Sequence, residues 1–181
     1  MRPPHLWMRE LFCLDEMIVA QHERKSSMEA CIFCKIAKGE APCHSIWEDE
    51  KHLAFLSIFP NTAGFSVVIT KQHYPSYAFH LPDDVLQSLT VAVKKVALLL
   101  DERLDDVGRT GMIFEGFGVD HIHAKLFPIH GTAHMKEWRP LNAHVDTYFE
   151  RYEGYISSHD YQRADDQALA TLARKIREAG A

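Results

Sequence analysis

The chain has 181 residues, a length that suits one domain. Its hydrophobic fraction of 46% and charged fraction of 25% are ordinary for a globular protein with a packed core. A net charge of −5 argues against an open surface for nucleic acid, and no apolar run is long enough to cross a bilayer, so neither nucleic acid nor membrane is an expected partner.

Residues 1–27 differ from the rest of the chain because they have no clear helix or strand period. They contain two prolines near their start and a polar run at their end. We expect a peripheral or mobile extension there, Met28 as the native start, and a single domain with a C-terminal tail over 28–181. Peptide mapping of the natural protein tests this boundary.

From Cys31 onward the pattern alternates between helix and strand, which indicates an α+β fold. Short apolar and β-branched runs predict strands at Ser45–Glu48, Leu53–Leu56, Phe65–Thr70, Gly111–Glu115 and His121–Phe127. Helices are expected at Ile32–Ile36, before Gly39, at Pro82–Arg103 and at Asp165–Glu178. The long helix carries one apolar stripe that we interpret as core: Leu86, Leu89, Val93, Val96 and Leu100.

The stretch 120–127 is the most informative part of the sequence. Alternate side chains of a strand point to opposite faces. One set is apolar and suits packing on the helix: Ile122, Ala124 and Leu126. The other set carries three nitrogen side chains: His121, His123 and Lys125. A neutral imidazole is a nucleophile or proton carrier near neutral pH and a lysine attracts phosphate oxygens, so this pattern indicates an anion-facing catalytic site rather than a plain polar strand.

Cys31 and Cys34 form a Cys-x-x-Cys pair among four cysteines. This spacing suits metal binding or redox exchange in a reducing compartment better than a disulfide framework, and we expect a cytoplasmic protein. Two sulfurs can hold half of a tetrahedral zinc site. A buried thiol pair and a redox dithiol are the alternatives, and the second usually follows a strand in a βαβ setting, which this sequence does not offer.

Five segments occur in the order typical of the histidine-triad (HIT) family, and the sequence resembles that family over roughly residues 28 to 130. The segments are Cys31-Ile-Phe-Cys34-Lys-Ile, Trp47-Glu-Asp-Glu50, Leu53-Ala-Phe-Leu56, the run from Gly64 to His73, and His121-Ile-His-Ala-Lys125. The resemblance implies an antiparallel sheet of about five strands with one long and one C-terminal helix, usually paired into a homodimer. It also implies a small nucleotide or related phospho-substrate.

The resemblance assigns roles to particular residues. His123 matches the family nucleophile that forms a covalent phospho-histidine intermediate, with His121 and Lys125 beside it as further catalytic candidates. The four positions that bind a structural zinc in members with the Cys pair match Cys31, Cys34, His73 and His121. Candidate substrate-binding residues are Ile32, Phe33, Ile36, Leu53, Phe55, Ser57 and Asn61. The apolar ones among these also suit plain core packing.

The sequence departs from the family pattern around the phosphate and the ribose. Lys125 replaces the third triad histidine, and a lysine is a fixed charge rather than a proton shuttle at neutral pH. Gly116-Phe-Gly-Val-Asp120 replaces the usual Gly-Gln-Ser/Thr-Val step. Ser57 replaces an acidic residue that commonly binds the ribose hydroxyls in the family. Phe65 stands where many members have histidine.

Three functions are therefore compared. The first is a zinc-containing phosphohydrolase or nucleotidyl transferase with His123 as its nucleophile. The second is a nucleotide-binding module with little turnover, and the third is a zinc-stabilised dimeric scaffold. Turnover of candidate nucleotides that His123→Ala abolishes would separate the first from the other two.

Overall fold

The computed structural model describes residues 30–135 and 162–178. The extension expected over 1–27 and Met28 lie outside the described residues. In chain order the elements are α2 (Ile32–Ala37), β1 (His44–Glu48), β2 (His52–Leu56), β3 (Ser66–Thr70), the 3-10 helix η1 (Ala78–His80), α3 (Asp83–Arg103), β4 (Val107–Ile113), β5 (His123–His130) and α4 (Asp166–Arg177). None of the described helices is both long and apolar enough to span a bilayer.

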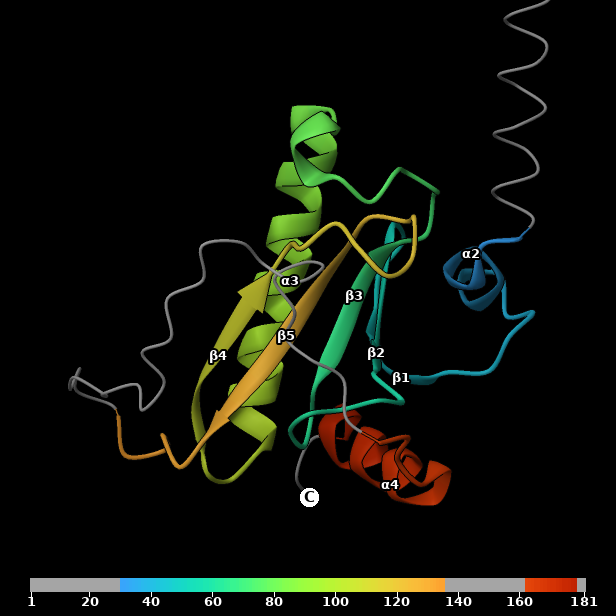
Figure 1. Ribbon diagram of the computed structural model, residues 1–181. Helices are drawn as coiled ribbons and strands as arrows, with labels where there is room; N and C mark the ends of the chain where they lie inside the picture. The colour runs from blue at the N-terminus through green and yellow to red at the C-terminus, as the bar shows by residue number, and fades with distance from the viewer. Residues whose placement is uncertain (1–29, 136–161, 179–181) are drawn as a thin grey trace, which may run out of the picture.

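The strands form one sheet in the order β1-β2-β3-β5-β4, and every neighbouring pair is antiparallel. The predicted α+β fold with a five-stranded antiparallel sheet, one long helix and a C-terminal helix is therefore confirmed. Figure 1 shows α3 and α2 on opposite sides of this sheet, with α4 near the end where β1 lies. Helices thus cover both faces.

Two apolar clusters fill the two faces of the sheet. The strands β2 and β3 are buried along their whole length, so alternate residues feed opposite clusters. Ala54, Leu56 and Val68 join the larger cluster beneath α3 and α4. Their neighbours join a smaller cluster beneath α2: Leu53, Phe55, Val67 and Ile69, with Phe33, Ile36, Ala37 and Cys43 packed against them.

The helix α3 begins after Pro82, which matches the preference of proline for helix starts, and Asp83 and Asp84 lie in its positive first turn. Its buried face consists of Leu89, Ala92, Val93, Val96 and Leu100. Burying one such aliphatic side chain contributes roughly 1.5–3 kcal/mol, so this stripe is a main source of stability. The predicted apolar stripe is confirmed as core, with Leu86 at its half-buried margin.

Two predicted strand boundaries were wrong. The strand expected at Gly111–Glu115 is Val107–Ile113, because β4 is an edge strand whose largely exposed polar residues hide its period. The strand expected at His121–Phe127 is His123–His130, and Pro128 is tolerated within it opposite Thr110, next to an irregular register. His121 therefore lies just before β5 instead of inside it.

The strand β5 retains the predicted alternation. Ile122, Ala124 and Leu126 are completely buried in the cluster beneath α3. His123 and Lys125 lie on the opposite face, where α2 is found. This register brings His123 and Lys125 to a cavity while their sequence neighbours hold the strand in the core.

The segment before α4 closes one end of that cavity. The backbone N–H of Ala164 donates to the carbonyl of Ile58 at 2.8 Å, which ties this segment to the loop after β2. Asp165 caps the helix by accepting from the backbone N–H of Ala168 at 2.9 Å. Arg163 and Asp166 consequently line the cavity although they are far from the other lining residues in sequence.

Candidate functional site

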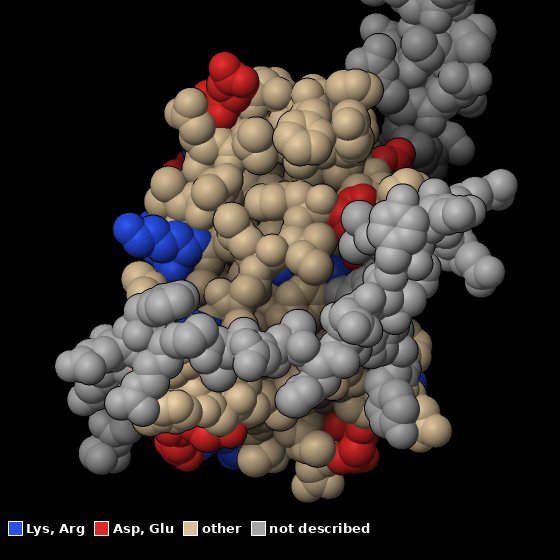
Figure 2. All heavy atoms as spheres, turned by 60° about the vertical axis from the view of Figure 1, so that its left-hand side comes forward, with Lys and Arg blue, Asp and Glu red and all other residues tan. Residues whose placement is uncertain are grey.

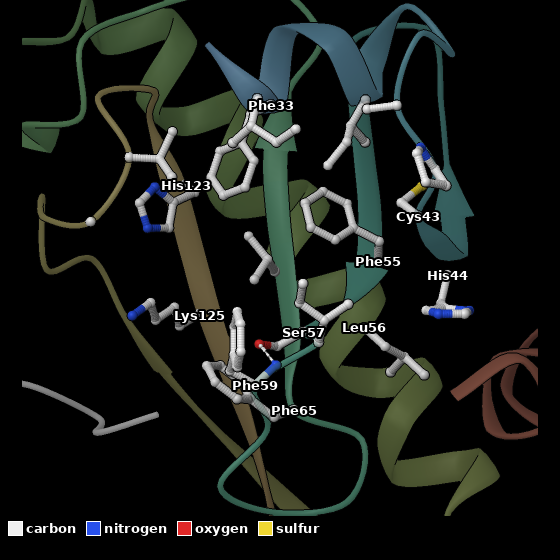
Figure 3. Close-up of a pocket in the computed structure, with 18 of the residues that line it drawn as sticks. Phe33, Cys43, His44, Phe55, Leu56, Ser57, Phe59, Phe65, His123 and Lys125 are labelled. Carbon is white, nitrogen blue, oxygen red and sulfur yellow. Dashed lines mark hydrogen bonds between the residues drawn. The ribbon is translucent and has the colours of Figure 1, made fainter. Parts of the chain in front are cut away.

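A cavity of about 840 Å³ lies on the α2 face of the sheet. Most of its lining is apolar or aromatic, and Figure 3 shows these side chains converging from α2, β2 and β3. The polar and charged lining residues are few: His44, Ser57, His123, Lys125, Arg163 and Asp166. A concave, mainly apolar site with a few convergent polar groups has the character of a small-molecule site.

His123 is 4% exposed and reaches this cavity from β5. Its Nδ1 donates a hydrogen bond to the backbone carbonyl of His121 at 2.7 Å. The carbonyl fixes the tautomer, so Nε2 carries the free lone pair. Burial lowers the pKa of His123, and the positive charge of Lys125 acts in the same direction, while the His121 carbonyl and Glu115 oppose it. The ring is thus held neutral and oriented, as a nucleophile requires.

Lys125 lines the same cavity two residues further along β5, and Figure 3 shows both side chains on one side of that strand. Its Nζ forms an ion pair with Oε1 of Glu115, from the loop after β4. The Lys125 side chain is 13% exposed and that of Glu115 only 2%. The third position of the motif is therefore a buried ion pair rather than a lone cation.

Phe33 of α2 makes T-shaped contacts with three rings around it. Its ring centroid lies 5.3 Å from that of His123, 5.9 Å from that of His121 and 5.6 Å from that of Phe55. Ile32 and Ile36 line the cavity next to Phe33, whereas Leu53 belongs to the core beneath α2. Of the predicted substrate residues, five line the cavity: Ile32, Phe33, Ile36, Phe55 and Ser57.

Ser57 and Asn61 have different surroundings. Ser57 lines the cavity, and its Oγ accepts the backbone N–H of Phe59 at 3.1 Å (Figure 3). Asn61 is exposed and is not part of the lining. Ser57 is thus the only one of these two polar candidates that the fold brings to the cavity.

Four side chains, among them His121, whose ring contacts Phe33, form a second constellation. One ligand atom from each of Cys31, Cys34, His73 and His121 lies within 4.8 Å of the others. Cys34 Sγ is 3.4 Å from Nδ1 of His73 and 3.6 Å from Nδ1 of His121, and Cys31 Sγ is 3.5 Å from Nδ1 of His121. Tetrahedral zinc at ordinary Zn–S and Zn–N lengths would separate such atoms by roughly 3.5 Å. The residues therefore fit a metal ion of this kind.

The orientation of His121 also suits a metal ligand. Its Nε2–H donates to the backbone carbonyl of Thr70 at 2.8 Å, which leaves Nδ1 free to face the two sulfurs. Burial lowers the pKa of His121 to about 4, so the ring is neutral at neutral pH. Burial, reinforced by Cys31, raises the pKa of Cys34 to about 11, so metal binding here must displace a thiol proton.

His121 therefore does not share the row of His123 and Lys125 at the cavity. It is completely buried and its ring nitrogens contact the cysteines and Thr70. The turn before β5 gives it this separate direction, because the strand begins only at His123. The expected row of three nitrogen side chains on one face is thus divided between two neighbouring sites.

Charged atoms are sparse on the face of the molecule shown in Figure 2. Lys, Arg, Asp and Glu atoms lie mostly toward its margins, and uncharged atoms fill much of its centre. No continuous belt of basic atoms crosses the described part of this face. The basic atoms visible on the described part of this face are therefore scattered and do not form one patch.

Sequence reasoning missed three charged residues near the cavity. Glu115 lies next to a glycine-bearing turn without any informative spacing, and only the fold pairs it with Lys125. Arg163 and Asp166 ion-pair with each other at 2.9 Å, and Asp166 also accepts from Nε2 of His44 at 3.0 Å. The sequence signal at Asp165–Asp166 was that of a helix start, which gave no indication of a cavity wall.

The comparisons with known proteins agree on one family. The family model described as "HIT domain" matches residues 38–131. An uncharacterized HIT-like protein of Methanocaldococcus jannaschii is 38% identical over 102 residues, which are 54% of this chain and 78% of that protein. The adenosine 5'-monophosphoramidase hnt1 of Schizosaccharomyces pombe is 37% identical over 100 residues, 55% of this chain and 74% of that protein.

A solved structure shares the fold. A zinc-bound histidine triad family protein from Mycobacterium smegmatis superposes with a TM-score of 0.59 at 22% identity, over 83% of this chain and 92% of that one. This identity is low, so the match concerns the architecture alone.

Proposed function

Because this chain belongs to the histidine-triad (HIT) family, we propose that it is a phosphohydrolase or nucleotidyl transferase acting on a nucleoside phosphate or a related phospho-substrate. One observation carries the proposal. His123 lines an apolar cavity of about 840 Å³, and its Nδ1 is fixed by the His121 carbonyl at 2.7 Å, which leaves the lone pair on Nε2. An oriented, neutral imidazole in such a cavity is suited to attack an electrophilic phosphorus.

The reaction would proceed in two displacements. Nε2 of His123 attacks the phosphorus, the N–P bond forms, and the bond to the leaving group breaks with its electron pair. Water or another acceptor then attacks the same phosphorus, the N–P bond breaks, and the electron pair returns to Nε2. Splitting one difficult displacement into two lowers each barrier, and the fixed donor geometry of Nδ1 keeps the ring aligned through both steps.

The cavity supplies the binding of the substrate. Phe33, Phe55 and Ile36 offer an apolar surface for a flat base, and Lys125 lies beside His123 for the phosphate oxygens. The Ser57 hydroxyl stands where a carboxylate is expected to bind the ribose. We therefore propose that contacts with the base and the phosphate contribute more to the binding free energy than contacts with the ribose.

We propose that Cys31, Cys34, His73 and His121 hold a structural zinc ion. When bound, the ion would supply a closed tetrahedral crosslink and no open coordination position for the reaction. It would join α2 to the segments before η1 and before β5, and so hold Phe33 against His123. We further propose that the protein forms a homodimer, and that it resides in the cytoplasm, a reducing compartment in line with the free thiols of Cys31, Cys34 and Cys43.

Incubation of the purified protein with adenosine 5'-phosphoramidate, diadenosine polyphosphates and adenosine 5'-phosphosulfate tests this function. We expect release of AMP from at least one substrate and a trapped AMP-sized mass increment on the peptide containing His123. His123→Ala should abolish both. Tight binding without turnover would favour a nucleotide-binding module, and neither binding nor turnover would favour a zinc-stabilised scaffold.

A further inference from the structure

The ion pair between Glu115 and Lys125 lies at the third position of the motif, two residues along β5 from His123. Lys125 lines the cavity and Glu115 lies behind it, with 13% and 2% of their side chains exposed. Apart from the Lys125 ammonium, no donor among residues 30–135 and 162–178 reaches either carboxylate oxygen of Glu115. Lys125 is therefore the group that balances this buried negative charge.

This dependence restricts what Lys125 can do. If the ammonium gave its proton to a leaving group, Glu115, whose side chain is only 2% exposed, would lose the partner of its negative charge. Such a separation is strongly unfavourable, because a buried carboxylate needs a partner to replace its lost hydration. Lys125 is thus fixed as a cationic hydrogen-bond donor toward the cavity and is a poor general acid.

Leaving groups differ in whether they need a proton. When an amine departs from phosphorus, the breaking P–N bond leaves electrons on a strongly basic nitrogen, which must gain a proton during the step. Sulfate, phosphate and carboxylate depart as stable anions and need none. A fixed ammonium stabilises the negative charge that develops on such a group.

We propose that the Glu115–Lys125 pair makes this site selective for substrates whose leaving group departs as an anion, with Glu115 as a positioning residue that acts through Lys125. This inference rests on the proposed function of the same site. For adenosine 5'-phosphosulfate, Nε2 of His123 forms the N–P bond while the P–O bond to sulfate breaks and its electron pair leaves with sulfate. Water then attacks the phosphorus, the N–P bond breaks, and the proton of the water passes to solvent.

The test compares two substrates that transfer the same adenylyl group, adenosine 5'-phosphosulfate and adenosine 5'-phosphoramidate. The measured quantity is the ratio of their kcat/KM values, which general damage to the fold would leave unchanged. We expect the wild type to favour the phosphosulfate. Glu115→Gln should lower the ratio by about tenfold or more, because Lys125 can then give a proton to the departing amine.

Two further variants make the assignment specific. Adding Lys125→Met to Glu115→Gln should remove the gain in phosphoramidate turnover, and this double variant leaves no unpaired buried charge that would impair folding. Glu48→Gln is the matched control, because it breaks the exposed ion pair with Lys71 (3.0 Å) and should leave the ratio unchanged. In the wild type, the ¹⁵N signal of the Lys125 ammonium should also exchange its protons more slowly than in Glu115→Gln.

The outcomes distinguish failure of the leaving-group selectivity from failure of the proposed function. Turnover with a ratio that Glu115→Gln leaves unchanged, or a wild type that favours the phosphoramidate, would overturn this inference and leave the proposed function intact. A wild type that releases AMP from neither substrate would overturn this inference, and one that also leaves diadenosine polyphosphates intact would overturn the proposed function.

Discussion

Nδ1 of His123 donates a 2.7 Å hydrogen bond to the backbone carbonyl of His121, whose own ring faces Cys31 and Cys34. The oriented imidazole at the cavity and the candidate metal cluster are therefore joined by two consecutive peptide units. Any movement of His121 shifts the acceptor that selects the tautomer of His123. Loss of the metal ligands is therefore expected to affect the orientation of His123.

Replacing His123 with alanine should lower adenylate turnover by roughly 1,000-fold or more, since the other histidine among the described lining residues, His44, is paired with Asp166. Stopped assays of AMP release measure the effect, and near-ultraviolet circular dichroism checks that the fold persists. Activity that survives in a folded His123→Ala protein would contradict the assigned nucleophile. His130→Ala serves as the control for loss of an exposed histidine on the same strand.

Elemental analysis should find about one zinc ion per chain, and Cys31→Ser should lose it, because a closed tetrahedral site needs all four ligands. We expect a lower Tm in this variant and in chelated wild type. Cys43→Ser is the matched control, as Cys43 lies outside the cluster and lines the cavity. Full-length protein without metal but with an unchanged Tm after chelation would mean that the two cysteines are only a thiol pair.

Phe33→Ala should weaken AMP binding by on the order of tenfold, because it removes the ring that packs at 5.3 Å from His123. Calorimetric titration with AMP measures this loss. Phe33→Leu keeps most of the apolar volume and should show a smaller effect. If both variants bind AMP like the wild type, the base lies elsewhere in the cavity.

The His130 ring should make stability depend on pH. The carbonyl of Ala63 and the carboxylate of Asp106 both accept from the ring, and they raise the pKa of His130. A raised folded-state pKa means that the stabilisation is full below the ordinary histidine value of about 6.5 and is lost as the pH rises through the raised value. Urea unfolding between about pH 6 and 8 should show this decrease.

His130→Gln should flatten that part of the stability profile. His134→Gln is a suitable control, since His134 is exposed and close in sequence. An unchanged slope in His130→Gln would assign the pH dependence to another group.

Much of this fold follows from local patterns. The period of α3 and the alternation along β2, β3 and β5 are visible in the sequence because each buries apolar residues at a regular spacing. The edge strand β4 was misplaced at both ends, since its outward residues are polar and its partners come from one side only. The cysteines and histidines of the cluster were identifiable because resemblance to a family supplied the long-range pairing.

The charged parts of the site were harder to predict. The ion pair of Glu115 with Lys125 forms only because the β4–β5 connection brings the two side chains together. In the sequence, one glutamate before a glycine has no distinctive spacing that would predict this pair. Arg163 and Asp166 reach the cavity through the contact of Ala164 with Ile58, more than a hundred residues away. Contacts of this kind depend on tertiary packing, which composition and period do not encode.

The two-residue period of β5 determines which of its side chains face the cavity. Its odd positions, His123 and Lys125, reach the cavity, and its even positions, Ala124 and Leu126, are completely buried against α3. Insertion of one residue after Ile122 would exchange these sets and place an imidazole and an ammonium in the core. An insertion at this point should therefore abolish both the cavity lining and the core packing of β5, whereas a substitution at position 125 keeps the register of the strand.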